Sequence, residues 1–146
     1  MRKKIKGVLN LNYIEVQNVP TEQSEQFGNG VRAEVLKNIE WMAATEILGR
    51  KVPIRGMEVK FFRSVLALSQ RQLGESLGYS DVAILKWEKA KFRRLDPVNE
   101  VAVRAFMAGH FGVKIPGTFE ALRGVAESPK KLVIVYKQME ALPKAA

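Results

Sequence analysis

Two short capped helices joined at a glycine constrain this chain more than any other feature. Ser69 stands three residues before Gln72. The Ser69 hydroxyl can therefore accept a hydrogen bond from the Gln72 amide while the Gln72 side chain reaches back, which is a capping box. Gly78 suits the left-handed residue that ends such a helix, and Ser80 can cap the next one. Residues 69–88 therefore predict two helices at a tight turn, as in a helix-turn-helix.

The second of these helices has two different faces. Ile84 and Trp87 lie three residues apart, and we expect both to face the core. The opposite face carries four side chains that we predict to contact base edges in the major groove: Asp81, Val82, Leu85 and Lys86. Val or Leu can contact thymine methyl groups, Lys can reach a guanine edge, and Asp can accept from a cytosine amino group. The alternative is that Val82 and Leu85 pack beneath the N-terminal segment or a partner.

Positive charge is concentrated around this segment. The chain has 24 Lys and Arg against 15 Asp and Glu, a formal net charge of +9, and residues 51–94 hold 10 of these basic and 4 of these acidic residues. Such an excess predicts a polyanionic partner, nucleic acid first. We expect phosphate contacts from the helix starts and the basic run that follows them: Gln70, Arg71, Ser80, Lys89, Lys91, Arg93 and Arg94. The alternative is a merely solvated basic face, and Phe92 within the run is expected in the core.

The pattern over residues 68–88 reads L-S-Q-x-x-L, then x-x-x-L-G, then x-S and I-x-x-W-E. It closely resembles the Cro/repressor (XRE) helix-turn-helix family. Over about residues 10–112 the chain is also similar to the MqsA-like (YgiT-type) antitoxins, because residues 54–63 match that family's entry to the helix-turn-helix. This resemblance implies dimer contacts after the recognition helix. It also raises an alternative function, an antitoxin that binds and neutralises a partner toxin, with DNA binding serving autoregulation.

Those antitoxins carry an N-terminal zinc unit in which Val-Pro and three further residues precede Cys-x-x-Cys-Gly. Here Val19-Pro20 is followed at that spacing by Ser24 and Phe27, which stand where the cysteines would. Neither side chain binds zinc in that role, and the chain has no Cys and a single His. We therefore expect no metal and no cofactor.

Nothing in the sequence predicts catalysis. No thiol nucleophile is present, and any triad would have to use His110, which we expect instead in the last turn of a helix. The carboxylates form no convincing pair, so we do not expect an enzyme. No apolar run approaches the ~18 residues of a membrane span. No signal-peptide pattern follows the basic start, so we expect a cytoplasmic protein.

The periodicity predicts a mostly α fold with small β elements, in three parts. We expect residues 1–50 to form an N-terminal strand or hairpin plus helix unit, residues 51–112 the helix-turn-helix domain, and residues 113–146 a tail with a short helix and a strand. The elements expected in the flanks are a strand over 8–19, a turn at Asn29-Gly30, a helix over 31–48, a helix from Thr118 to Leu122 and a strand over 131–137.

We expect a sequence-specific transcriptional regulator that binds its operator in double-stranded DNA as a homodimer, most simply a repressor of its own operon. A dimer places two recognition helices about 34 Å apart. The helix that opens at Asp96-Pro97 is apolar on more than one face, and we place Val103 and Phe106 at the twofold interface. The alternative is the strand 131–137, whose edge could pair with its symmetry mate or with the strand 8–19.

Overall fold

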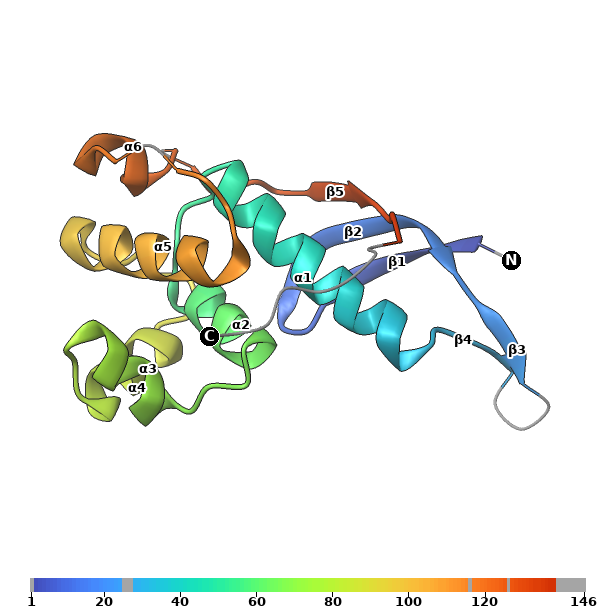
Figure 1. The fold of residues 1–146 in the computed structure, drawn as a ribbon, viewed down its shortest axis with the longest axis horizontal. Helices are drawn as coiled ribbons and strands as arrows, with labels where there is room; N and C mark the ends of the chain where they lie inside the picture. The colour runs from blue at the N-terminus through green and yellow to red at the C-terminus, as the bar shows by residue number, and fades with distance from the viewer. Residues whose placement is uncertain (1, 25–27, 116, 126, 139–146) are drawn as a thin grey trace.

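The computed structural model describes residues 2–24, 28–115, 117–125 and 127–138. The fold is mixed α/β, with six helices and two small sheets in these residues, and so holds more strand than the mostly α fold that the sequence predicts. The molecule is elongated (Figure 1). Its sheets lie at one end, most of its helices at the other, and one long helix, α1, runs between them.

The larger sheet has the order β1–β2–β5. Strands β1 (Arg2–Val8) and β2 (Leu11–Pro20) form an antiparallel hairpin. Strand β5 (Leu132–Val135) lies parallel to β2 on its other side, with Ile14 opposite Leu132. The two predicted strands therefore pair with each other within the chain, so one edge of β5 is already covered by β2. The unit expected as a strand or hairpin is thus a hairpin, although the sequence does not predict the bounds of β1.

A second, two-stranded sheet pairs β3 (Glu22–Ser24) with β4 (Gly28–Gly30) in antiparallel fashion. Glu22 lies opposite Gly30 and Gln23 opposite Asn29. The prediction of a turn at Asn29-Gly30 is wrong, because these two residues belong to a paired strand. Phe27, one of the two positions at which the related antitoxins carry cysteine, lies outside the described residues.

Helix α1 (Ala33–Gly49) joins the two ends of the molecule. It buries Val35, Ile39 and Ile47, and it contacts all three strands of the larger sheet as well as α2 and α5. The ring of Trp41 lies 4.5 Å from the ring of Phe111, between centroids, so α1 is packed directly on α5. The helix predicted over 31–48 is thus confirmed, and it packs against both the larger sheet and the helical end of the molecule.

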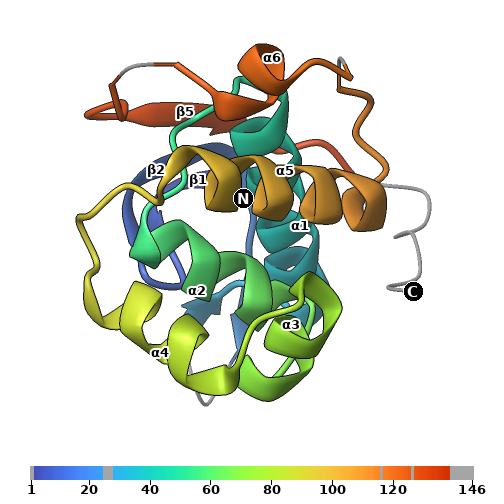
Figure 2. The ribbon, with the colours of Figure 1, turned by 90° about the vertical axis from the view of Figure 1, so that its left-hand side faces the viewer.

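The helical end contains α2 (Gly56–Val65), α3 (Gln70–Leu77), α4 (Asp81–Lys89), α5 (Pro97–Phe111) and α6 (Phe119–Arg123). Figure 2 shows α5 lying across α1, with α2, α3 and α4 below it. Pro97 occupies the start of α5 and Thr118 caps α6, both as predicted. No helix in the described part of the chain is long and apolar enough to cross a membrane.

The three sequence segments share one hydrophobic core. Polar contacts also tie the hairpin to the helices. Asn10 Nδ2 donates to the Met57 carbonyl at 3.0 Å, and the Tyr13 hydroxyl donates to Glu58 Oε2 at 2.9 Å. The N-terminal sheet is therefore held rigidly against α2, which in turn supports α3 and α4.

Candidate nucleic-acid interface

The turn between α3 and α4 has the local chemistry that the sequence predicts. Ser69 Oγ accepts from the Gln72 amide at 3.0 Å, and Gln72 Oε1 accepts from the Ser69 amide at 2.8 Å. Gly78 ends α3 in the left-handed region with φ +80°, and Ser80 Oγ accepts from the Ala83 amide at 3.2 Å. These four residues fix where both helices begin and where the first one ends.

Two glycines bring the helices closer together than any larger residue would allow. A Cβ on Gly74 would lie 2.6 Å from the Tyr79 carbonyl oxygen, so the middle of α3 touches the turn that follows it. A Cβ on Gly56 would lie 1.9 Å from the Trp87 carbonyl oxygen, where the start of α2 meets the end of α4. Neither close contact could be predicted from the sequence. The only available signal was a glycine inside a helix, where it costs about 1 kcal/mol relative to alanine.

A two-point ion pair fastens α4 to α2. Arg63 Nε and Nη2 donate to the two oxygens of Glu88 at 2.7 and 2.8 Å. This hydrogen bonding raises the pKa of Arg63. Gln70 Nε2 also donates to Glu88 Oε1 at 3.2 Å, so the side chain expected on a DNA phosphate is already bonded within the protein. Arg63 and Glu88 are 25 residues apart in sequence, and their spacing gave no sign of the pair.

The four residues expected to contact bases share an exposed face of α4. Val82 is 54% exposed and Leu85 37% exposed, with Asp81 and Lys86 beside them in solvent. Asp81 Oδ1 accepts from the Val82 amide at 2.9 Å and so stabilises the helix start. On the inner face Ile84 is fully buried. Trp87 is only partly buried, with its ring 5.1 Å from that of Tyr79.

The basic run after α4 divides between the surface and the interior. Lys89, Lys91 and Arg93 are exposed, and no ion pair holds any of them within the described residues. Arg94 is different, because its Nη2 lies 2.9 Å from Glu100 Oε1 and also donates to the Arg123 carbonyl. The phosphate contact expected from Arg94 is therefore corrected. Its guanidinium is engaged inside the protein.

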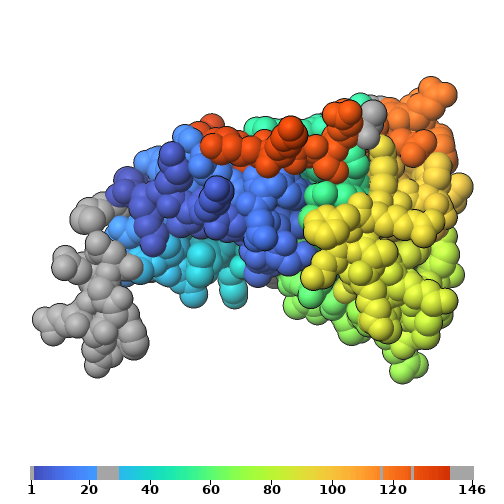
Figure 3. Space-filling model, turned by 180° about the vertical axis from the view of Figure 1, so that it is seen from behind, coloured from blue at the N-terminus to red at the C-terminus, as the bar shows by residue number. Residues whose placement is uncertain are grey.

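Phe92 corrects a second expectation, since it is 77% exposed and not part of the core. The loop that carries it lies against the tip of the β1–β2 hairpin, where yellow meets blue in Figure 3. A groove of about 400 Å³ lies along this junction, and Lys60, Lys91 and Asn12 line it together with Phe92. Lys60 thus joins the cations near α4, although it lies on α2, outside the basic run in which phosphate contacts are predicted.

Ser80 and Arg71, two further residues expected on phosphates, are exposed at the starts of their helices. Arg71 forms an exposed ion pair with Glu75.

The two residues placed at a dimer interface differ in their surroundings. Val103 is fully buried in the core of its own chain, so it cannot also contact a twofold partner, and that expectation is wrong. Phe106 is partly buried, with its ring 4.4 Å from the imidazole of His110. His110 lies in the last turn of α5, as predicted.

Within the residues that the structure describes, no three His, Cys, Asp or Glu side chains come together as metal ligands. Comparison of the chain with protein-family models, with curated proteins and with solved structures finds no match. The candidate interface is therefore defined by its own geometry. It consists of a rigidly held short helix with an exposed face that is partly apolar and partly cationic, and an exposed basic loop beside it.

Proposed function

We propose that this protein binds double-stranded DNA through α4 and regulates transcription. In this proposal α3 and α4 act as a helix-turn-helix, and α4 enters the major groove. One observation carries the proposal, namely that Val82 and Leu85 stand in solvent next to Lys86 on a helix that the rest of the chain holds firmly. Exposed aliphatic side chains gain nothing in water, but against DNA they can contact thymine methyl groups while the lysine reaches a base edge.

The surrounding charges support the same function. Lys89, Lys91 and Arg93 extend the positive surface beyond the end of α4, and Lys60 lies on the neighbouring groove. Exposed cations of this kind neutralise DNA phosphates and release counterions, which supplies sequence-independent affinity. The side chains on α4 would then supply the sequence preference.

A single helix-turn-helix contacts too little DNA for useful selectivity, so the proposal includes a homodimer. Two copies related by a twofold axis would place their α4 helices in successive major grooves, about 34 Å apart. The preferred site would then have twofold symmetry, and the simplest such site lies upstream of the protein's own gene.

The decisive experiment is a salt series. Binding of the full chain to labelled duplex from upstream of its own gene, and to random duplex of equal length, is measured by fluorescence anisotropy between 50 and 300 mM KCl. We expect the logarithm of affinity to fall linearly with the logarithm of salt concentration on both duplexes. We also expect the upstream duplex to bind at least about 10³-fold more tightly at physiological salt. Salt-insensitive or absent binding would overturn the DNA proposal, and equal affinity for both duplexes would overturn the regulatory part.

A further inference from the structure

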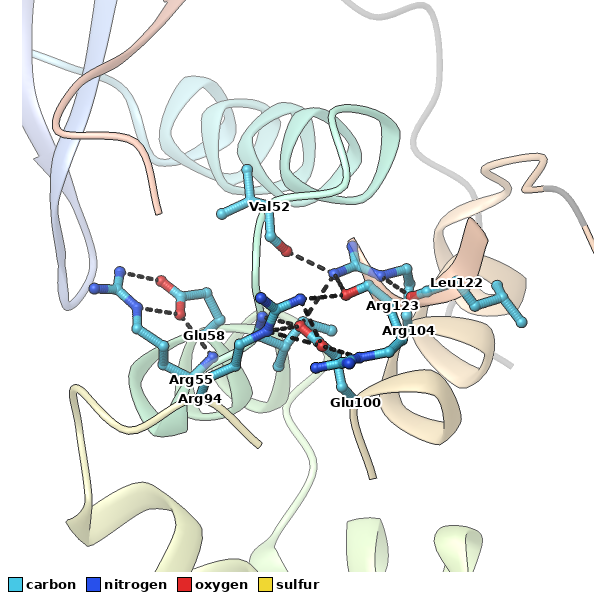
Figure 4. Close-up of polar contacts among 9 residues, drawn as sticks. Val52, Arg55, Glu58, Arg94, Glu100, Arg104, Leu122 and Arg123 are labelled. Carbon is cyan, nitrogen blue, oxygen red and sulfur yellow. Dashed lines mark hydrogen bonds and ion pairs between the residues drawn. The ribbon is translucent and has the colours of Figure 1, made fainter. Parts of the chain in front are cut away.

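Three arginines surround one buried carboxylate behind the exposed basic loop. Glu100 is fully buried, and Arg94 Nη2 and Arg123 Nε lie 2.9 and 3.6 Å from its Oε1. Arg104 Nη2 lies 3.6 Å from Glu100 Oε2, and its side chain is itself fully buried. Figure 4 shows the three guanidinium groups converging from the loop before α5, from α5 and from the end of α6. We refer to Arg94, Glu100, Arg104 and Arg123 as the arginine cluster.

The arginine cluster carries more positive charge than its one carboxylate neutralises. Backbone carbonyls take up part of the excess, because Arg104 donates to the carbonyl oxygens of Val52 and Leu122. Even so, Arg104 Nη1 and Arg123 Nε are buried and have no hydrogen-bond partner among the described residues. Burial also lowers the pKa of Arg104. Both guanidinium groups share the one carboxylate of Glu100 at 3.6 Å, and each keeps a buried nitrogen without a hydrogen bond in the described part of the chain. Such incompletely satisfied groups are costly to bury, and a bound anion would stabilise them.

An opening reaches two residues of this cluster, while Glu100 and Arg104 lie buried behind them. A cleft of about 350 Å³ is lined by Arg94, Arg123, Glu120 and Gly124. A single water occupies about 30 Å³ in the liquid, so the cleft has room for a ligand of several atoms. Gly124 is required beside it, because its φ is +92° and a Cβ there would lie 2.6 Å from Arg104 Nη2.

We propose that the arginine cluster is a binding site for a phosphate group, taken either as inorganic phosphate or as the phosphomonoester of a small molecule. Guanidinium groups bind phosphate through paired, charge-assisted hydrogen bonds, and Arg123, whose side chain is 37% exposed, presents such a group at the cleft. Arg94, already bonded to Glu100, adds positive charge to the wall of the cleft. A bound dianion would balance the excess charge around Glu100. The exposed cations of α4 take no part, so this inference does not rest on the proposed function.

Glu120 should affect phosphate binding in the opposite direction to Arg123. It is exposed at the rim of the same cleft, where its carboxylate opposes an incoming anion. Removing the Arg123 charge should therefore weaken phosphate binding, whereas removing the Glu120 charge should strengthen it. Opposite responses to two neutralising substitutions would not arise if these residues served only to hold α6 in place.

The test is isothermal titration calorimetry of the full chain without DNA, at constant ionic strength in a chloride buffer. Inorganic phosphate and phosphoserine are titrated separately to distinguish the two ligand sources. We expect one phosphate per chain, with Arg123→Gln weakening binding about tenfold or more and Glu120→Gln tightening it severalfold. Arg32→Gln and Glu34→Gln are matched controls, since this exposed ion pair lies at the opposite end of α1, and both should leave the affinity unchanged.

We expect each variant to fold, because Arg123 and Glu120 are both accessible to solvent. Circular dichroism of each variant verifies this. A stoichiometric isotherm that Arg123→Gln weakens and Glu120→Gln tightens supports the site. Absence of a one-to-one isotherm for both ligands overturns it. Equal, weak heats in all four variants would also overturn the site, because they would reflect nonspecific association of anions with a basic protein.

Discussion

Arg63 on α2 and Glu88 on α4 form a two-point ion pair in which both nitrogen to oxygen distances are below 3 Å. The Glu88 side chain is only 5% exposed, and Arg63 is 19% exposed. Arg63 Nη1 also donates to the carbonyl of Leu68, just before the capping box of α3. One guanidinium thus positions both helices of the candidate interface.

Glu88→Ala should therefore destabilise the fold. Removing one partner of a largely buried pair leaves the other charge uncompensated, at a cost of about 3 kcal/mol. Urea denaturation followed by circular dichroism measures this loss. The control is Glu75→Ala, whose partner Arg71 lies 3.2 Å away but in solvent, so the midpoint should barely move. Equally small shifts in both variants would mean that the Arg63–Glu88 pair does not hold α4.

Gly74→Ala should destabilise the protein, although alanine favours a helix. The new Cβ would lie 2.6 Å from the Tyr79 carbonyl oxygen, so the turn must move, at a cost of about 1–3 kcal/mol. Gly109→Ala is the control, because nothing lies within 4 Å of its Cβ position on α5. There the same change should stabilise the fold by about 0.5–1 kcal/mol. Thermal melting of both variants decides the point, and a raised melting temperature for Gly74→Ala would contradict the close contact.

The parts of this fold that the sequence predicts correctly are those with local causes. The Ser69 cap, the left-handed Gly78 and the Thr118 cap each depend on residues within a few positions. Strand β1 has no such local cause. It is mostly basic, and it is a strand because β2 pairs with it through register positions such as Ile5 and Val16. That partner could not be identified from the residues of β1 themselves.

The candidate site shows the same division. Val82 and Leu85 follow from the phase of a single helix, and the structure exposes them as expected. Val103 lies on a helix that is apolar on several faces, and only the packing of the whole chain shows which face is covered. The position of Arg94 in a basic run predicts a phosphate contact. Its partner Glu100 lies on the next helix, and no spacing rule connects the two.

Leu85→Ala and Lys86→Ala should each reduce binding to the preferred DNA site more than binding to random duplex. Each base contact is worth about 1–3 kcal/mol, whereas random sequence offers no matching base edges. Leu36→Ala and Lys37→Ala make the same changes at an exposed Leu-Lys pair on α1 and should affect neither duplex. Fluorescence anisotropy measures all four. Equal losses on both duplexes for Leu85→Ala and Lys86→Ala would show that they do not contact bases.

Replacing Lys89, Lys91 and Arg93 together with Gln should weaken binding to any DNA sequence. Each lost phosphate contact lowers the slope of the log–log salt plot by about 0.9, so the triple variant should lose up to about 3 units. Arg94→Gln should instead lower the melting temperature, because this residue pairs with buried Glu100. An unchanged salt slope in the triple variant would show that these three side chains make no phosphate contacts and only face solvent.

Phe106→Glu tests the dimer. With Val103 buried, the twofold contact on α5 has to come from its outward side chains, and Phe106 is the largest of those that are partly accessible. A charge at a closely packed interface is strongly unfavourable, so we expect a folded monomer with weakened binding to the preferred DNA site. Size-exclusion chromatography with light scattering gives the mass, and circular dichroism shows whether the fold is kept.

The control is Phe119→Glu, at a Phe that is 47% exposed on α6, and it should leave the dimer intact. A dimeric Phe106→Glu variant with normal DNA binding would place the interface elsewhere, first at the second edge of β5, which no strand of the described chain covers.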